Sequence, residues 1–243
     1  MKVYYRISDS GYNKVKPDYI SNENCYNNFI NNFKHPNEVI LIADNVSDVT
    51  WSWCQNMRDR DGLLEIHRTN GGSSGKGFNI CYDMAIQHDD DEIIFFVEND
   101  YIFVDGIYDF MLEAFYFGIE YLTPYLHPDK FIPASQGGNV LVDDDGGQVT
   151  KVFNTGSRFW MLTDSTTMTF ASTVGVLKQD MDIIKAFTSE PYPNDCKMFH
   201  SLRDKGRSLA QPIPTLATHG ETSWMASTIG LHTNNWEDII YGK

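Results

Sequence analysis

A short acidic motif, Glu98-Asn99-Asp100, directly follows an apolar run at residues 93–97. A run of this length predicts a buried strand, and alternate residues of a strand share a face. The carboxylates of Glu98 and Asp100 are therefore expected to converge on one cation, while Asn99 points away. Carboxylate oxygens suit Mg²⁺ or Mn²⁺, with a diphosphate and water as further ligands. The alternative is an acidic turn at the end of a strand.

A glycine- and serine-rich segment precedes this motif, RTNGGSSGKGFNICYDMAI at residues 68–86. Small residues let backbone N–H groups approach an anion, a helix amino end carries partial positive charge, and Lys76 adds a full one. The segment is not a Walker A loop, because Asn70 replaces its first glycine and Gly77 replaces its Ser or Thr; nor is it G-x-G-x-x-G. It is either a phosphate loop or a flexible loop with a solvated lysine.

The elements that would position these segments alternate in type along the first half of the chain. Apolar runs predict four strands, and amphipathic stretches predict helices between them, at residues 2–7, 39–43, 63–67 and 92–97 for the strands and 20–33, 49–58 and 78–87 for the helices. This pattern favours an α/β fold with a mainly parallel sheet covered by helices. Such sheets bind ligands beyond the carboxyl ends of their strands, where both segments would lie.

The second half is less regular. Its patterns predict a helix at 109–121, a hairpin from strands at 139–142 and 149–153, and a helix at 195–205 closed by Gly206. The 243 residues are expected to form a single domain.

Charge and hydropathy exclude several classes of function. The formal charge of −14 opposes binding to nucleic acid or an anionic membrane surface, since both need clustered Lys and Arg. The amino terminus lacks the apolar stretch of a signal peptide, and no run could span a bilayer. We therefore expect a soluble, cytoplasmic protein.

The chain resembles the GT-A glycosyltransferases, particularly the large inverting, family 2-like group. The match runs through Asn70-Gly71-Gly72, Gly75-Lys76-Gly77, Asn79 and FFVENDYIF at residues 95–103. It departs at Glu98, where the group more often has Asp, so this would be an E-x-D variant. The resemblance implies a Rossmann-like GT-A domain over residues 1–243, with a nucleotide-sugar-binding half at 1–103 and a smaller acceptor-binding β/α region at 104–243.

The resemblance also implies roles for individual residues. Asp195 would be the catalytic base, although the group usually has two adjacent acids where this chain has Asn194-Asp195, and either residue could instead cap a helix. His219, after an apolar strand, would join Glu98 and Asp100 as a ligand of Mn²⁺ or Mg²⁺. The residues implied at the nucleotide sugar are Arg6, Ser8, Asp44, Asn70, Gly75, Lys76, Asn79 and Asn99.

The expected function is metal-dependent transfer of a sugar from a UDP- or GDP-linked donor to a hydroxyl of a glycan or other acceptor, with inversion. Two alternatives stay open. A sugar nucleotidyltransferase usually has its basic glycine-rich loop after the first strand, where this chain has Ser8-Asp9-Ser10-Gly11. The other alternative is an inactive GT-A-like module that binds a nucleotide or glycan. Three tryptophans could stack on sugars or pack in the core, namely Trp160, Trp224 and Trp236.

Overall fold

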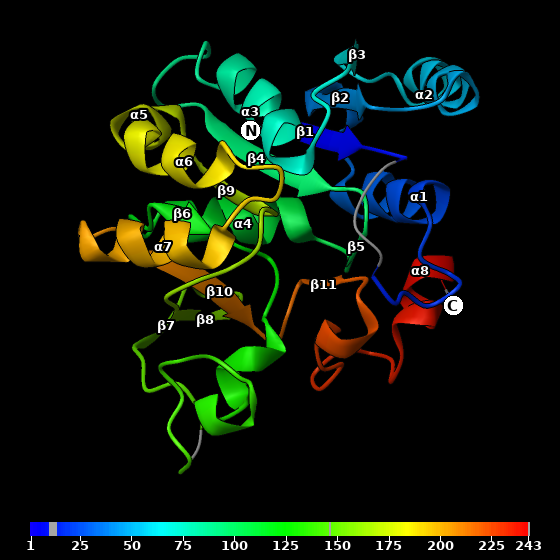
Figure 1. Ribbon diagram of the computed structural model, residues 1–243. Coiled ribbons are helices and arrows are strands. Elements are labelled where there is room, and N and C mark those ends of the chain that lie inside the picture. The colour runs from blue at the N-terminus through cyan, green and yellow to red at the C-terminus, as the bar shows by residue number, and fades with distance from the viewer. Residues whose placement is uncertain (10–13, 146, 243) are drawn as a thin grey trace.

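The computed structural model describes residues 1–9, 14–145 and 147–242. Its centre is a nine-stranded sheet in the order β3-β2-β1-β4-β9-β6-β10-β8-β7, beside a two-stranded sheet of β11 and β5 (Figure 1). The strands are β1 Lys2–Ile7, β2 Val39–Asp44, β3 Glu65–Thr69, β4 Ile93–Glu98, β5 Tyr101–Phe103, β6 Tyr121–Leu122, β7 Val152–Asn154, β8 Phe159–Leu162, β9 Phe170–Thr173, β10 Leu209–Ile213 and β11 Ala217–His219.

The helices cover both faces of the large sheet. They are α1 Asn22–Phe33, α2 Asp48–Asp61, α3 Ser74–Ala85, α4 Ile107–Phe115, α5 Val174–Gln179, α6 Met181–Thr188, α7 Asp195–Asp204 and α8 Trp236–Tyr241, with short 3-10 turns at η1 Pro36–Glu38, η2 Pro128–Phe131, η3 Ala134–Gln136 and η4 Thr222–Trp224. No helix among the described residues is long and apolar enough to cross a membrane.

The predicted βαβ order of the first half is confirmed. β1 pairs in parallel with both β2 and β4, and β2 pairs in parallel with β3. Serines start the intervening helices: the Ser21, Ser47 and Ser73 hydroxyls each accept a hydrogen bond from a backbone N–H of the first turn. The third strand begins two residues later than predicted, because α2 runs on to Asp61 before its left-handed cap at Gly62.

Two hydrophobic layers form because side chains alternate between the faces of each strand. Tyr5 and Phe95 pack in the layer that includes Phe29 of α1, whereas Tyr4 and Phe96 pack in the opposite layer with Phe78 of α3. β2 is buried along its whole length. Burial on both faces explains why these strands read as continuous apolar runs.

The second half corrects two expectations and adds strands to the sheet. The helix predicted at 109–121 ends at Phe115, since Gly118 turns the chain at a φ of 75° and Tyr121 enters β6. Residues 139–142 form no strand; instead β7 pairs antiparallel with β8. The added strands make the sheet parallel from β3 to β4 and mixed beyond it. The helix predicted at 195–205 is confirmed as α7.

The strand order reverses between β1 and β4. From β1 the chain builds outward through β2 and β3, then returns to place β4 on the other side of β1. The gap between strands whose connections diverge in this way is the usual ligand site of an open α/β sheet. Arg6, near the end of β1, is directly paired with Glu98 at the end of β4.

Candidate functional site

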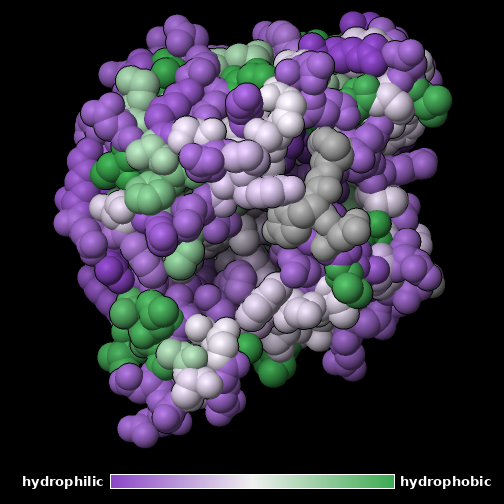
Figure 2. All heavy atoms as spheres, in the orientation of Figure 1, coloured by the Kyte–Doolittle hydropathy of each residue, from purple (hydrophilic) through white to green (hydrophobic). Residues whose placement is uncertain are grey.

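A cavity of about 1120 Å³ opens at the carboxyl ends of β1 and β4. Figure 2 shows it as a hollow near the middle of the viewed face, with mostly hydrophilic residues around it. Both halves of the chain contribute to its walls. Of the residues predicted at the site, those that line the cavity are Arg6, Ser8, Glu98, Asn99, Asp100, Asp195 and His219.

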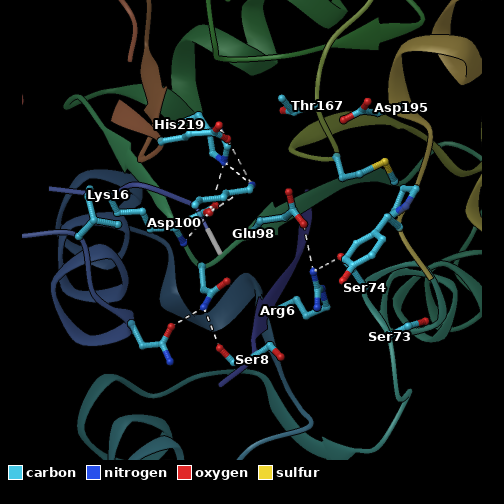
Figure 3. Close-up of a pocket in the computed structure, with 18 of the residues that line it drawn as sticks. Arg6, Ser8, Lys16, Ser73, Ser74, Glu98, Asp100, Thr167, Asp195 and His219 are labelled. Carbon is cyan, nitrogen blue, oxygen red and sulfur yellow. Dashed lines mark hydrogen bonds and ion pairs between the residues drawn. The ribbon is translucent and has the colours of Figure 1, made fainter. Parts of the chain in front are cut away.

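Arg6 links the ends of both strands to the start of α3. Its Nη2 lies 3.0 Å from Glu98 Oε1 and 3.1 Å from Ser74 Oγ, and its Nη1 lies 3.8 Å from Asp44 Oδ2. Glu98 is thus held by a guanidinium rather than turned with Asp100 toward a shared cation (Figure 3).

Asp44 is buried beneath this surface and does not line the cavity. Its carboxylate accepts hydrogen bonds from the Gly71 N–H at 2.8 Å, the Thr69 hydroxyl at 3.0 Å and the Asn45 amide at 3.0 Å. A side chain on Gly77 would place a Cβ only 2.2 Å from Asp44 Oδ2. Asp44 therefore lies outside the cavity wall and holds the glycine-rich segment in place.

The glycine-rich segment meets the cavity at residues other than those predicted. Gly72, Ser73 and Ser74 line it, whereas the exposed Asn70 and Lys76 lie outside its walls. The start of α3 borders the cavity at Ser73 and Ser74, and Figure 3 shows Ser74 beside Arg6. Any anion contact of the segment would come from this helix end and not from a lysine-bearing loop.

Gly75 and Asn79 attach α3 to the connection between α6 and α7. A Cβ at Gly75 would lie 2.2 Å from the Glu190 carbonyl oxygen, and the Gly75 N–H donates to the Pro191 carbonyl at 3.1 Å. Asn79 Nδ2 donates to the Thr188 carbonyl at 2.9 Å. The missing side chain at Gly75 and the hydrogen bond from Asn79 therefore allow α3 to pack closely against the segment that leads to Asp195.

Asn99 joins the β4–β5 turn to the loop after β1. Its Nδ2 donates to the Ser8 carbonyl at 3.2 Å and to Asn22 Oδ1. Both Asn99 and Ser8 line the cavity. The amide thereby ties the turn after β4 to the loop after β1 at the wall of the cavity.

Asp100 lies in a cluster of basic side chains. Its Oδ2 is 2.9 Å from Lys16 Nζ, 3.7 Å from Lys14 Nζ and 3.3 Å from His219 Nε2, and Lys14 Nζ is also 3.0 Å from that nitrogen. Burial by itself raises the pKa of Asp100, but His219 and the two ammonium groups outweigh it and hold the pKa well below its ordinary value. Asp100 therefore stays ionised.

The two-stranded sheet of β11 and β5 brings His219 next to Asp100. β11 pairs antiparallel with β5 so that His219 is opposite Tyr101, and their rings stack with centroids 5.1 Å apart. The Gly220 N–H donates to the Asp100 carbonyl at 2.7 Å. Two segments far apart in sequence thus place an imidazole and a carboxylate at one point.

A divalent cation fits these residues only in part. Asp100 and His219 could supply two ligand atoms, but the Glu98 oxygen nearest Arg6 is already bonded, and two ammonium groups surround the Asp100 oxygen. Within the described ranges no three His, Cys, Asp or Glu side chains form a group that could hold a metal ion. The expected Mn²⁺ or Mg²⁺ therefore stays a prediction.

Asp195 is the first residue of α7. Asn194 is the cap, with its side-chain oxygen accepting from the Lys197 N–H, so Asp195 is not needed for that role. Its Oδ1 accepts from the Cys196 N–H at 2.8 Å. Burial raises the pKa of Asp195 to about 6, and the nearby Glu98 charge acts in the same direction. A half-buried carboxylate with this pKa has the properties of a general base.

Several lining residues had no assignment from sequence, namely Lys14, Lys16, His127, Thr167 and Glu221. The sequence feature that could have identified Lys14 and Lys16 is a pair of basic residues in the loop after the first strand of an otherwise acidic chain. Trp224 packs against His127 with ring centroids 5.2 Å apart. Trp160 and Trp236 are buried in the core, which leaves Trp224 as the tryptophan of the three that lines the cavity.

Comparison with solved structures identifies the fold. A protein assigned as a glucose-1-phosphate thymidylyltransferase from Bacillus anthracis matches with a TM-score of 0.55 at 10% identity, over 91% of this chain and 90% of that one. Residues 1–349 of TarS from S. aureus match with a TM-score of 0.47 at 16% identity, covering 87% of this chain and 58% of that one. A 4-diphosphocytidyl-2C-methyl-D-erythritol synthase from Anaerococcus prevotii gives 0.47 at 12% identity, over 99% and 93%.

No protein-family model matches the chain, and no curated protein matches it in sequence. The likeness to the Bacillus anthracis protein, at 10% identity, concerns the fold alone. The chain has a GT-A-like α/β fold, as the sequence predicted.

Proposed function

We propose that this chain is a glycosyltransferase that moves a sugar from a UDP- or GDP-linked donor to a hydroxyl group of a glycan or other acceptor. The observation that carries this proposal is one cavity that combines basic side chains at the strand ends with Asp195 at its rim. The cavity of about 1120 Å³ exceeds the usual range of small-molecule sites, roughly 300–1,000 Å³, so a donor and part of an acceptor fit together.

Asp195 would act as the general base in a single displacement. Its carboxylate would take the proton of the acceptor hydroxyl while that oxygen attacks the anomeric carbon and the diphosphate leaves. A pKa of about 6 leaves most of the carboxylate ionised at neutral pH and makes it a stronger base than an ordinary aspartate. Inversion at the anomeric carbon follows from a single displacement and is part of the proposal.

The experiment is a transfer assay with UDP- and GDP-sugars against a panel of glycan acceptors, comparing the natural chain with Asp195→Asn. Loss of positioned base catalysis is expected to lower kcat by about 10²–10⁴-fold. The Asn variant keeps the side-chain oxygen that accepts from Cys196, so donor binding is expected to persist. Retention of most of the turnover by Asp195→Asn would remove Asp195 from this role.

Sugar nucleotidyl transfer is the second candidate, and Lys14 and Lys16 favour it. The loop after the first strand carries basic residues that line the cavity. Residues 8–11 alone, which contain no basic side chain, had indicated the opposite. Of those four positions, 10–11 lie outside the described residues. Release of pyrophosphate from a nucleoside triphosphate and a sugar 1-phosphate would establish this activity, and an acceptor base such as Asp195 would be dispensable to it.

An inactive binding module is distinguished by the same assays. Such a module would bind a nucleoside diphosphate at this cavity, with neither sugar transfer nor donor hydrolysis across the acceptor panel and no release of pyrophosphate. The elevated pKa of Asp195 favours an enzyme, because perturbed carboxylates in clefts concentrate at catalytic sites.

A further inference from the structure

Two lysines meet one carboxylate oxygen in the wall of the cavity. Lys14 and Lys16 come from the loop between β1 and α1, line the cavity, and lie 3.7 Å and 2.9 Å from Asp100 Oδ2. The Lys14 side chain is 13% exposed and that of Lys16 is 33% exposed. One carboxylate balances one ammonium group, so this pair carries more positive charge than Asp100 neutralises.

A second carboxylate, that of Glu221, also pairs with Lys14. Glu221 Oε2 lies 4.0 Å from Lys14 Nζ, the limit of an ion pair, and Glu98 is bonded to Arg6. Asp195 lines the same cavity, and in Figure 3 it is drawn well apart from Asp100 and Lys16. The ammonium groups of Lys14 and Lys16 therefore form, with Arg6, the basic part of an otherwise acidic wall.

A lysine side chain can exchange one hydrogen-bond partner for another. Its ammonium group has three donors on a flexible stem, so it can keep one bond to Asp100 and turn another toward a phosphate oxygen. A divalent cation bound to the same Asp100 oxygen would instead be placed within a few ångströms of both ammonium groups, since each already lies within 3.7 Å of that oxygen. Like charges so close repel, which disfavours a metal while the lysines hold these positions.

We propose that Lys14 and Lys16 bind the diphosphate of the donor directly, so that binding of a nucleoside diphosphate at this cavity needs no divalent cation. This inference rests on the proposed function for the identity of the ligand. Asp100 is then a positioning residue that holds the two ammonium groups at the strand end. His219, 3.0 Å from Lys14 Nζ, completes the cluster from the other half of the chain.

The test is calorimetric titration with UDP, GDP, ADP, CDP and dTDP, in EDTA and again with Mn²⁺. At least one diphosphate is expected to bind in EDTA, with a Kd within about threefold of its value in Mn²⁺. Lys14→Gln and Lys16→Gln are each expected to weaken that binding about 10-fold or more, the scale of one charged hydrogen bond. Binding of the matching nucleoside, which lacks phosphate, should be unchanged in both variants.

Two control variants distinguish the loss of positive charge at the site from the loss of charge elsewhere. Thermal melting distinguishes both from unfolding. Lys34→Gln removes the same charge at an exposed position paired with Asp105, and it should leave Kd unchanged. Lys16→Arg keeps the positive charge and is expected to recover most of the affinity. Thermal melting of each variant checks that the fold is intact.

Binding that requires Mn²⁺ and is unaffected by Lys14→Gln and Lys16→Gln would overturn the inference, and so would the absence of binding by all five diphosphates. A failure of the proposed function can be distinguished from a failure of this inference. Lysine-dependent binding in EDTA without sugar transfer would leave this inference standing and reject the transferase, whereas transfer that depends on Mn²⁺ but not on the lysines would do the reverse.

Discussion

Arg6 and Glu98 are direct partners across the parallel strands β1 and β4, and their side chains form an ion pair with Nη2 3.0 Å from Oε1. The side chains are 10% and 21% exposed, so solvent screens the pair only in part. The pair joins the two strands at the point where the strand order reverses. It also commits Glu98, which the acidic motif suggested as a metal ligand, to a contact within the protein.

Glu98→Gln is expected to lower the free energy of unfolding by about 1–3 kcal/mol, because Arg6 keeps a hydrogen-bond partner but loses its nearest negative charge. Urea denaturation measures the change. Glu38→Gln removes a comparable ion pair with Lys2, exposed by 23% and 24%, at a distance from the cavity. That control should cost about 1 kcal/mol or less, and an equal cost for both variants would contradict a special role for the Arg6 pair.

Asp100→Asn is expected to destabilise the protein at neutral pH by about 2–4 kcal/mol, since it leaves Lys14 and Lys16 without their shared carboxylate. The folded-state pKa of Asp100 is lowered, so its stabilisation is present above the ordinary carboxyl pKa and is lost as pH falls below it. Urea denaturation of both proteins at pH 7 and pH 3 should therefore show a gap that narrows in acid.

The matched control for Asp100 is Asp105→Asn, which removes a carboxylate 67% exposed and paired with the exposed Lys34. A surface pair of this kind contributes about 0–1 kcal/mol. If Asp100→Asn cost no more than Asp105→Asn at pH 7, the basic cluster would not depend on Asp100.

Asp195→Asn is expected to change stability with the opposite sign. The folded-state pKa of Asp195 is raised to about 6, so folding opposes its ionisation, and the penalty is absent in acid and complete above pH 6. At pH 7.5 the variant should be more stable by about 1–2 kcal/mol, a gain in Tm of roughly 2–8 °C. Thermal melts at pH 7.5 and pH 4 measure it, and a gain that persists at pH 4 would have another cause.

The rate of the proposed transferase is expected to depend on pH for the same reason. With an acceptor in hand, kcat/KM should rise as pH increases through about 6, because the base must be ionised to accept the proton. A profile that is flat between pH 5 and pH 8 would argue against Asp195 as the base.

Lys76→Ala tests the phosphate-loop hypothesis. Lys76 is exposed and lies outside the cavity wall, so the variant should bind a nucleoside diphosphate with an affinity within about twofold of the natural chain. Calorimetry compares it with Lys16→Gln. A loss of affinity at Lys76 as large as that at Lys16 would restore the lysine of the glycine-rich segment to the site.

Gly75→Ala tests the close packing of α3 on the segment before α7. Its Cβ would lie 2.2 Å from the Glu190 carbonyl oxygen and 2.5 Å from that of Thr188, and backbone atoms have little freedom to retreat. The expected loss is about 1–3 kcal/mol in urea denaturation. Lys76→Ala, the next residue of the same helix, serves as the control and should lie within about 0.5 kcal/mol of the natural chain.

Much of the fold could be predicted from the sequence because the patterns that specify its strands and helices are local. Apolar runs such as residues 93–97 and serine caps such as Ser73 act within a few neighbours, so they specify strands and helix starts before any packing occurs. The β-α order then places the ends of β1 and β4 together, and with them Arg6, Glu98 and Asp100. The strand at 139–142 of the predicted hairpin was wrong because its composition suits a turn as well as a strand.

Only the tertiary structure decided what these residues do to one another. Lys14 and Lys16 lie in a loop without periodicity, so nothing local indicated that both would meet Asp100. The raised pKa of Asp195 arises from burial by segments distant in sequence, and burial likewise separates Trp224 at the cavity from Trp160 in the core. Electrostatic and solvation effects depend on the distances between groups, and only folding determines which groups lie close together.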